Sequence, residues 1–383
     1  MNVLFVCAWW PSRVHPTHGN FVQKHARVVA RRHSLTVLAV QEDPTMAAGR
    51  LKCEIGEEFG YRVVQVYYGR AAATPQWLNL YNRAHAYVAG AREAKRLNGR
   101  PDIVHGHVVV DGGIVAALLG RSYGVPHIIT AHSIIYREPK ALSLTRRLLA
   151  KWATRRAAAV LPVSDQLGRD MQRVNGLSGN YITVPNVVDE QLFKLSEGWE
   201  EGEVFKLLHV SNFDRWQKNP EGLLRAFAAL NAEQPGCFSL RIAGDGDPNF
   251  LRALIEKSGL SMEVVTLTGP HSEREVADLM QQHHALVLFS NYETQGVVLL
   301  EALISGLPCV AARVGGVPSV IREGENGFMV KPGDEAELVR ALKRIVKKYN
   351  TFNHHRMRRE AIDKYGEQAI GRRLDDLYDR ARK

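Results

Sequence analysis

Two carboxylates, Glu293 and Glu301, stand on either side of Gly296 in the segment 290–302. The segment follows an apolar run at 285–289, typical of a buried strand, and opens a helical pattern that should end near residues 305–306. A helix that begins here leaves its first amides, including those of Val297 and Val298, without intrahelical partners. Such amides and the helix dipole suit a phosphate, and Gly296 would let the backbone approach that anion closely.

The spacing of the two carboxylates suggests a more specific ligand. Glu301 should lie about four residues into the helix, roughly 6 Å along its axis, whereas Glu293 precedes the helix on the opposite side of the anion position. Two carboxylates that flank an anion can accept hydrogen bonds from hydroxyl pairs on two sugars joined through a diphosphate, the layout of a nucleotide sugar. From spacing alone, Glu301 could equally be a solvated helix residue and Glu293 a loop charge.

Short apolar runs separated by helical patterns must position these residues. They occur at 3–8, 35–40, 103–105 and 127–130 in the first half, and at 205–210, 239–243, 264–267, 285–289 and 309–312 in the second. Continuous apolar strands alternating with helices predict parallel sheets covered on both faces, and hence two doubly wound α/β domains. The polar stretch 195–202 is the expected linker, so we predict domains at 1–194 and 203–364. No GxGxxG follows the first strand, which disfavours a dinucleotide-dependent oxidoreductase.

The composition is that of a soluble globular protein, with 383 residues, 45% of them hydrophobic and 23% charged. The sequence contains no run of about 18 apolar residues, so we predict no membrane span. The start of the chain does not resemble a signal peptide. Four cysteines at scattered positions are expected to be free thiols, three of them in apolar contexts that predict burial: Cys7, Cys53, Cys237 and Cys309. This cysteine usage favours a cytoplasmic location.

Positive charge is concentrated in the first half of the chain. The net charge is +10; residues 1–194 carry 25 Lys and Arg against 13 Asp and Glu, and residues 195–383 carry 25 against 27. A basic first half suggests an anionic partner, which could be nucleic acid, an acidic membrane surface or a phosphorylated acceptor. Nucleic acid is not expected, because no recognisable binding motif with interleaved aromatic residues is present.

The segment 140–159 is a basic, amphipathic helical pattern. It contains six basic residues and no acid, and its apolar residues include Leu148, Leu149 and Trp152; the basic residues are Lys140, Arg146, Arg147, Lys151, Arg155 and Arg156. Such a helix could lie on anionic lipid and make the protein peripheral at the inner face of a membrane. The alternative is a domain helix whose apolar stripe faces its own core.

Glu293 and Glu301 reproduce the E-x7-E arrangement of family 4 of the retaining glycosyltransferases, which have the GT-B fold. The resemblance continues downstream through Glu301-Ala302-Leu303-Ile304-Ser305-Gly306-Leu307-Pro308, Val314-Gly315-Gly316-Val317-Pro318 and Gly324-Glu325-Asn326-Gly327. The resemblance implies two Rossmann-like domains facing an interdomain cleft, the first binding the acceptor and the second binding the donor. It also implies that the final helix, 365–383, packs back on the first domain.

The resemblance also implies roles for further residues. The loop 209–219 is similar to the one that carries the family's phosphate-binding Lys and Arg. Lys218 matches well, whereas Arg215 is the nearest arginine but stands at a different spacing. Thr130-Ala131-His132 resembles the motif T-x-H, whose histidine faces the transferred sugar. Other matching loops contribute Gly19 and, on the nucleobase side, Gly269 and Pro270. The sequence departs from the family at Gln295, where an aromatic residue is usual.

The activity implied is transfer of a hexose-type sugar, with retained configuration, from a nucleoside-diphosphate sugar to a hydroxyl of a glycan, lipid-linked or small-molecule acceptor, with UDP favoured over GDP in the donor. No metal and no cofactor is implied; accordingly, we interpret Asp245-Gly246-Asp247 as a turn, and His105 and His107 as structural or cleft-edge residues. A sugar-nucleotide epimerase of the same fold and a non-catalytic carbohydrate- or nucleotide-binding homologue remain as alternatives.

Overall fold

The first strand, β1 (Asn2–Cys7), is buried on both faces, which explains its uniformly apolar sequence. Val3, Phe5 and Cys7 pack into one hydrophobic cluster, and Leu4 and Val6 pack into another on the opposite side of the sheet. This alternation follows from the two-residue period of a strand. The computed structural model describes residues 1–70, 75–138 and 141–383, and they divide into two units.

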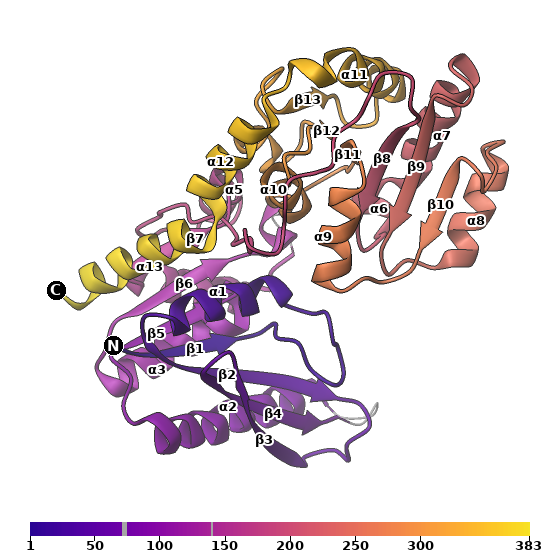
Figure 1. Cartoon of the computed structure of the whole chain (residues 1–383). Coiled ribbons are helices and arrows are strands. Elements are labelled where there is room, and N and C mark those ends of the chain that lie inside the picture. Colours follow the sequence, from indigo (N-terminus) through magenta and orange to yellow (C-terminus); the bar gives the residue numbers. More distant parts are fainter. Residues whose placement is uncertain (71–74, 139–140) are drawn as a thin grey trace. The chain divides into compact units, whose positions relative to one another are not determined.

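The N-terminal unit comprises Met1–Val187 and Ile370–Lys383. Its sheet has seven strands in the order β3-β4-β2-β1-β5-β6-β7, all parallel except the antiparallel edge strand β3 (Figure 1). The elements are β1, α1 (Asn20–Ala30), β2 (Ser34–Asp43), β3 (Leu51–Glu58), β4 (Tyr61–Gly69), α2 (Gln76–Asn98), β5 (Ile103–His107), η1 (Val109–Gly113), α3 (Ile114–Tyr123), β6 (His127–Ala131), η2 (Ile134–Arg137), α4 (Leu144–Arg156), β7 (Ala159–Pro162), α5 (Asp165–Arg173) and, from Ile370 on, α13 (Glu367–Arg382).

The C-terminal helix α13 is part of the N-terminal core. Ile370, Leu374 and Tyr378 are buried in the same cluster as Val3 and Phe5 of β1. The Tyr378 hydroxyl also lies 2.7 Å from Nδ1 of His105, a buried residue of β5. The last helix therefore completes one face of the sheet that the first strand begins.

The C-terminal unit comprises Val188–Ala369, with a single hydrophobic core around a sheet of six parallel strands in the order β10-β9-β8-β11-β12-β13 (Figure 1). Its elements are β8 (Phe205–Val210), α6 (Arg215–Lys218), α7 (Pro220–Glu233), β9 (Phe238–Ala243), α8 (Pro248–Lys257), β10 (Val265–Thr268), α9 (Glu273–Gln281), β11 (Ala285–Leu288), α10 (Val297–Ile304), β12 (Cys309–Ala312), η3 (Val317–Ser319), β13 (Gly327–Val330), α11 (Glu335–Lys348), η4 (Tyr349–Thr351) and α12 (His354–Tyr365).

Both sheets reverse their winding direction beside a central strand. In the C-terminal unit, β8 pairs with β9 on one side and with β11 on the other. In the N-terminal unit, β1 pairs with β2 and β5. At such a switch point the loops that leave the two neighbouring strands diverge to opposite faces, and open α/β sheets bind ligands in the crevice between those loops. The expected doubly wound α/β architecture is therefore present twice.

Some local expectations differ from the structure. The stretch 195–202 was the expected linker, yet it lies within the C-terminal unit, where the Ser196 and Glu197 amides donate to the carbonyls of Ser305 and Gln281 at 2.9 Å each. Cys7 and Cys309 are buried, whereas Cys53 and Cys237 are exposed, so two cysteines are buried and not the predicted three. Cys53 lies on the edge strand β3, where most residues face solvent. No helix of the described residues has the length and hydropathy to cross a membrane.

Candidate functional site

The loops that follow β8 and β11 are joined by hydrogen bonds at the switch point of the C-terminal unit. The Asn291 backbone N–H donates to the Gln217 carbonyl at 2.8 Å, and the Gln217 side-chain amide donates to the Tyr292 carbonyl at 3.2 Å. These contacts fix the short helix α6 against the segment that precedes α10. Residues at the end of α6 and at 290–293 are therefore brought together by the sheet topology.

An ion pair lies at this junction. Nζ of Lys218 is 2.6 Å from Oε1 of Glu293, and the Ser290 hydroxyl donates to the same oxygen at 2.8 Å. The two charged side chains are only 13% and 6% exposed. Hydrogen bonds between charged groups are strong at such a site, so the carboxylate is held in one orientation beside a cation.

Gly315 supports Glu293 from the other side. The Gly316 N–H donates to the Glu293 carbonyl at 3.0 Å. Gly315 has φ of +48°, and a Cβ placed on it would lie 1.7 Å from that carbonyl oxygen. Only glycine can fill this position without moving the Glu293 backbone. The motif Val314-Gly315-Gly316-Val317-Pro318 therefore holds the Glu293 backbone in place.

The helix α10 begins directly after Gly296, which has φ of +78° and no side chain with which to cap the helix. Val297 and Val298 are the first two helical residues and are partly buried. Their amides belong to the turn in which an α-helix leaves N–H groups unpaired, beside the positive end of its dipole. Glu301 is buried in the second turn. The site thus combines a helix N-terminus, a lysine and two buried carboxylates.

The remaining donor-site candidates lie apart from Glu293. The Arg215 guanidinium pairs with Glu221 at 2.8 Å, lies 4.1 Å from the Phe250 ring centroid and is 66% exposed. The structure therefore brings Lys218, but not Arg215, to Glu293. Gly269 and Pro270 are exposed after the edge strand β10. Asp247, from the sequence Asp-Gly-Asp, is the N-cap of α8, as expected for a turn.

His209 also belongs to the site, and no sequence-based prediction assigned it a role. It is fully buried in β8; Nδ1 lies 2.9 Å from the Val287 carbonyl and Nε2 lies 3.0 Å from the Ser211 hydroxyl. Burial lowers its pKa to about 4, and Lys218 adds to this effect. A neutral histidine therefore connects β8 with β11 within electrostatic reach of Lys218. Its position at the end of a strand was the only sequence signal.

In the N-terminal unit, His132 follows β6 and lies within a group of buried rings. Its Nε2 is 3.3 Å from Nδ1 of His107, and its ring centroid is 4.6 Å from that of Phe21. Burial lowers the pKa of His132 well below its usual value, so the ring is neutral. Gly19 begins α1 with φ of +87°. His105 has a structural position, because its Nε2 lies 2.7 Å from the Thr130 hydroxyl.

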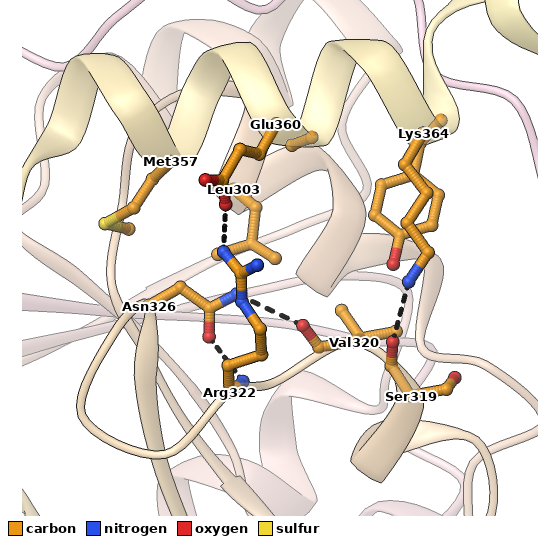
Figure 2. A pocket seen from close by; sticks show the side chains of 10 residues that line it. Leu303, Ser319, Val320, Arg322, Asn326, Met357, Glu360 and Lys364 are labelled. Atoms are coloured by element: carbon orange, nitrogen blue, oxygen red, sulfur yellow. Dashed lines mark hydrogen bonds and ion pairs between the residues drawn. The ribbon is translucent and has the colours of Figure 1, made fainter.

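A small cavity in the C-terminal unit explains the motif Gly324-Glu325-Asn326-Gly327. The cavity, of about 70 Å³, lies under α12, where Arg322 forms an ion pair with Glu360 and Lys364 donates to the Ser319 carbonyl (Figure 2). Asn326 accepts from the Arg322 N–H and donates to the Val320 carbonyl. The cavity is far smaller than ordinary ligand pockets. Asn326 of the Gly324–Gly327 motif therefore stabilises a turn.

The C-terminal unit is a doubly wound α/β unit with a helix N-terminus and two buried carboxylates at its switch point, the position where open α/β sheets bind ligands. Comparison with known families agrees. Residues 204–348 match the family described as glycosyl transferases group 1, and residues 19–192 match glycosyltransferase family 4. The chain belongs to the family 4 glycosyltransferases of the GT-B fold and is a glycosyltransferase.

Individual relatives span both units. The chain is 28% identical over 294 residues to N-acetyl-alpha-D-glucosaminyl L-malate synthase of Bacillus anthracis, covering 72% of this chain and 74% of that protein. It is 31% identical over 265 residues to alpha-D-kanosaminyltransferase of Streptomyces kanamyceticus, covering 63% and 67%. Among solved structures, sucrose-phosphate synthase from Thermosynechococcus elongatus matches with a TM-score of 0.80 at 21% identity, covering 99% and 98%. HepE of Anabaena, solved with UDP-glucose, matches with a TM-score of 0.71 at 18% identity, covering 99% of each chain.

Proposed function

We propose that this glycosyltransferase moves a hexose-type sugar from a UDP-linked donor to an acceptor hydroxyl, with retention of the anomeric configuration. The observation that carries the proposal is the arrangement before and within α10: Lys218, at the end of α6, pairs with Glu293 in the loop that leads to α10, and Glu301 is buried in the second turn of α10. UDP is favoured over GDP because the similar fold of HepE was solved with UDP and with UDP-glucose.

In the proposed reaction, the donor diphosphate lies at the amides of Val297 and Val298, near the Lys218 ammonium. Glu301 accepts hydrogen bonds from the ribose, and Glu293 accepts them from the transferred sugar. The bond between the anomeric carbon and the diphosphate oxygen breaks, while the acceptor oxygen bonds to the same face of that carbon. The acceptor proton passes to the leaving phosphate. Preorganised positive charge stabilises the leaving group, so the proposal requires no metal and no cofactor.

The N-terminal unit is the proposed acceptor-binding unit, with His132 facing the transferred sugar. A neutral imidazole can accept or donate a hydrogen bond to a sugar hydroxyl. The acceptor is a glycan, a lipid-linked molecule or a small molecule. The four free cysteines support a cytoplasmic location, because disulfides persist mainly in oxidising compartments.

Nucleotide binding to three variants and the wild type tests the donor site. UDP at about 100 times its Kd should stabilise the fold by roughly 2.7 kcal/mol, and GDP at the same concentration should stabilise it less. Glu301→Ala should weaken UDP binding by about tenfold to 100-fold, because hydrogen bonds to a charged group are lost. Glu293→Ala should mainly reduce turnover. The exposed Glu201→Ala is the matched control. Unchanged UDP affinity and turnover in the first two variants would overturn the assignment.

Product analysis tests the reaction itself. With donor and an acceptor of each class, the product should carry the sugar in the donor's anomeric configuration, and a metal chelator should not alter the rate. Incubation of UDP-sugar without acceptor should leave the sugar unchanged. A donor converted to its epimer without acceptor would instead support an epimerase, and an inverted product would contradict the retaining mechanism.

A further inference from the structure

A large apolar groove opens in the N-terminal unit, between α2, α3 and α4. Its volume is about 890 Å³, within the range of pockets that hold small molecules. Trp77 and Leu80 of α2, Leu118 of α3 and Leu149 of α4 contribute large apolar side chains to its lining. Three helices thus converge on one apolar surface.

The apolar side chains of this groove are unusually exposed. Trp77 is 71% exposed, Leu80 62%, Leu118 53% and Leu149 43%. Leu148 continues the apolar surface along α4. Exposed apolar residues are common singly, but a contiguous patch around a groove marks a surface that another molecule covers. These exposed fractions also bear on the basic segment 140–159, for which the alternatives were a helix that lies on lipid and a helix whose apolar stripe faces its own core. The leucines of α4 face outward, and the helix buries Ala150, Ala153 and Thr154 instead; Lys140 lies outside the described residues.

The groove is bordered by positive charge. Arg70, which pairs with Glu42 at 3.6 Å, and Arg146 line it, and the Arg146 guanidinium forms no ion pair with any residue within the described ranges. The acid in the lining, Asp111, is already paired with Arg83 of α2. Because α4 contains four further cations and no acid, the field at its start favours an anion.

The groove reaches the carboxyl edge of the N-terminal sheet. Val110 and Asp111, which line it, belong to η1 after β5, next to the switch point at β1. Val108 and Asp111 have φ of +68° and +79°, conformations that L-residues avoid and that cluster at ligand sites. The groove therefore begins where a parallel sheet presents its ligand-binding loops and extends outward along the helices.

We propose that this groove binds the hydrocarbon chain of a lipid-linked acceptor and that the phosphate at the head of that chain pairs with Arg146. The inference rests on the proposed transferase function and narrows its acceptor to an anionic amphiphile. An exposed apolar lining that includes Arg146, which is unpaired among the described residues, complements such a molecule, whereas a short polar acceptor would leave the apolar lining in water.

Dodecyl phosphate, titrated below its micellar concentration into the full chain, tests the groove without requiring the natural acceptor. Calorimetry measures the affinity, and because the chain has six tryptophans, the fluorescence change that is lost in Trp77→Phe provides the local signal. Leu118→Asp places a charge in the apolar wall, and Arg146→Glu reverses the charge near its end. Val88→Asp and Arg92→Glu are matched controls, because both residues are exposed on α2 and lie outside the groove lining.

Dodecyl phosphate should bind the wild type and both controls, and each groove variant should weaken it by about tenfold or more, the loss expected from one charged hydrogen bond or a disrupted apolar contact. Dodecyl maltoside, with its neutral head, should bind more weakly than the phosphate. Equal binding by groove and control variants, or binding only to vesicles of phosphatidylglycerol and not to the monomeric probe, would overturn the proposal.

UDP binding separates this inference from the proposed function. The thermal shift caused by UDP reports on the C-terminal unit, and circular dichroism confirms that each variant is folded. If UDP stabilises all variants but dodecyl phosphate binds none, the groove assignment fails and the donor assignment stands. If dodecyl phosphate binds as expected but UDP does not, the donor assignment fails and the groove remains a lipid site without the acceptor role.

Discussion

The Lys218 ammonium and the Glu293 carboxylate lie 2.6 Å apart at the carboxyl ends of two adjacent strands, β8 and β11. Seventy-five residues separate them in the sequence. Their side chains are largely buried, so each charge depends on the other for compensation. The pair therefore contributes both to the stability of the C-terminal unit and to the distribution of charge at the proposed donor site.

Lys218→Met should reduce stability and turnover together. Removal of one member of a buried ion pair leaves the other charge uncompensated, at a cost of about 3 kcal/mol in the free energy of unfolding. Turnover should fall by about 100-fold, because a cation near the leaving group is lost. Urea unfolding and initial rates measure the two effects. Adding Glu293→Gln should restore most of the stability but none of the turnover; recovery of both would show that Lys218 is only structural.

Arg215→Ala should behave very differently. The guanidinium is mostly exposed and pairs with Glu221, and exposed ion pairs contribute about 0–1 kcal/mol. We therefore expect turnover and UDP affinity to change by less than about fivefold, which corresponds to 1 kcal/mol. Parallel steady-state kinetics of this variant and Lys218→Met provide the comparison. A loss comparable to that of Lys218→Met would show that Arg215 leaves Glu221 when the donor binds.

Gly315→Ala tests the support of Glu293. The added Cβ would lie 1.7 Å from the Glu293 carbonyl oxygen, so the site loop must move. Gly333→Ala is the matched control, since its φ is +76° and nothing lies within 4 Å of its added Cβ. The control should cost only the left-handed strain of about 1–2 kcal/mol. The free energy of unfolding should fall further for Gly315→Ala, and UDP affinity should fall only there. Equal losses in both variants would exclude the steric explanation.

Buried histidines should make the N-terminal unit sensitive to acid. Burial lowers the pKa of His105 to about 3, and lowers those of His107 and His132 well below 6.5. The unfolded chain therefore binds more protons than the folded chain, and stability should decrease as the pH falls from about 6.5 towards 3. One such histidine contributes a slope of about 1.4 kcal/mol per pH unit. His105→Gln should reduce the slope measured by urea unfolding, whereas the exposed His355→Gln should not.

Sequence patterns predicted the architecture because buried parallel strands are continuous apolar runs, such as β1 and β11. They missed the β3–β4 hairpin. β3 is an edge strand whose side chains mostly face solvent, so it lacks an apolar run, whereas β4 is buried and its largely apolar run was not recognised. Glu293 and Gly296 indicated the candidate site, because they stand between the predicted strand at 285–289 and the helix that follows it. Spacing could not reveal that Arg215 turns towards Glu221, because side-chain direction depends on neighbours distant in the sequence.

The contribution of α13 to the N-terminal core has a consequence for synthesis of the chain. Ile370, Leu374 and Tyr378 fill a cluster that includes residues of β1, yet they are translated only after the whole of the C-terminal unit. The C-terminal unit is continuous from Val188 to Ala369, so all of its strands leave the ribosome before the first unit is complete. Chains ordinarily fold from the N-terminal domain onward during synthesis. Here the second unit can fold first, while the nascent first unit exposes an incomplete core that chaperones can bind.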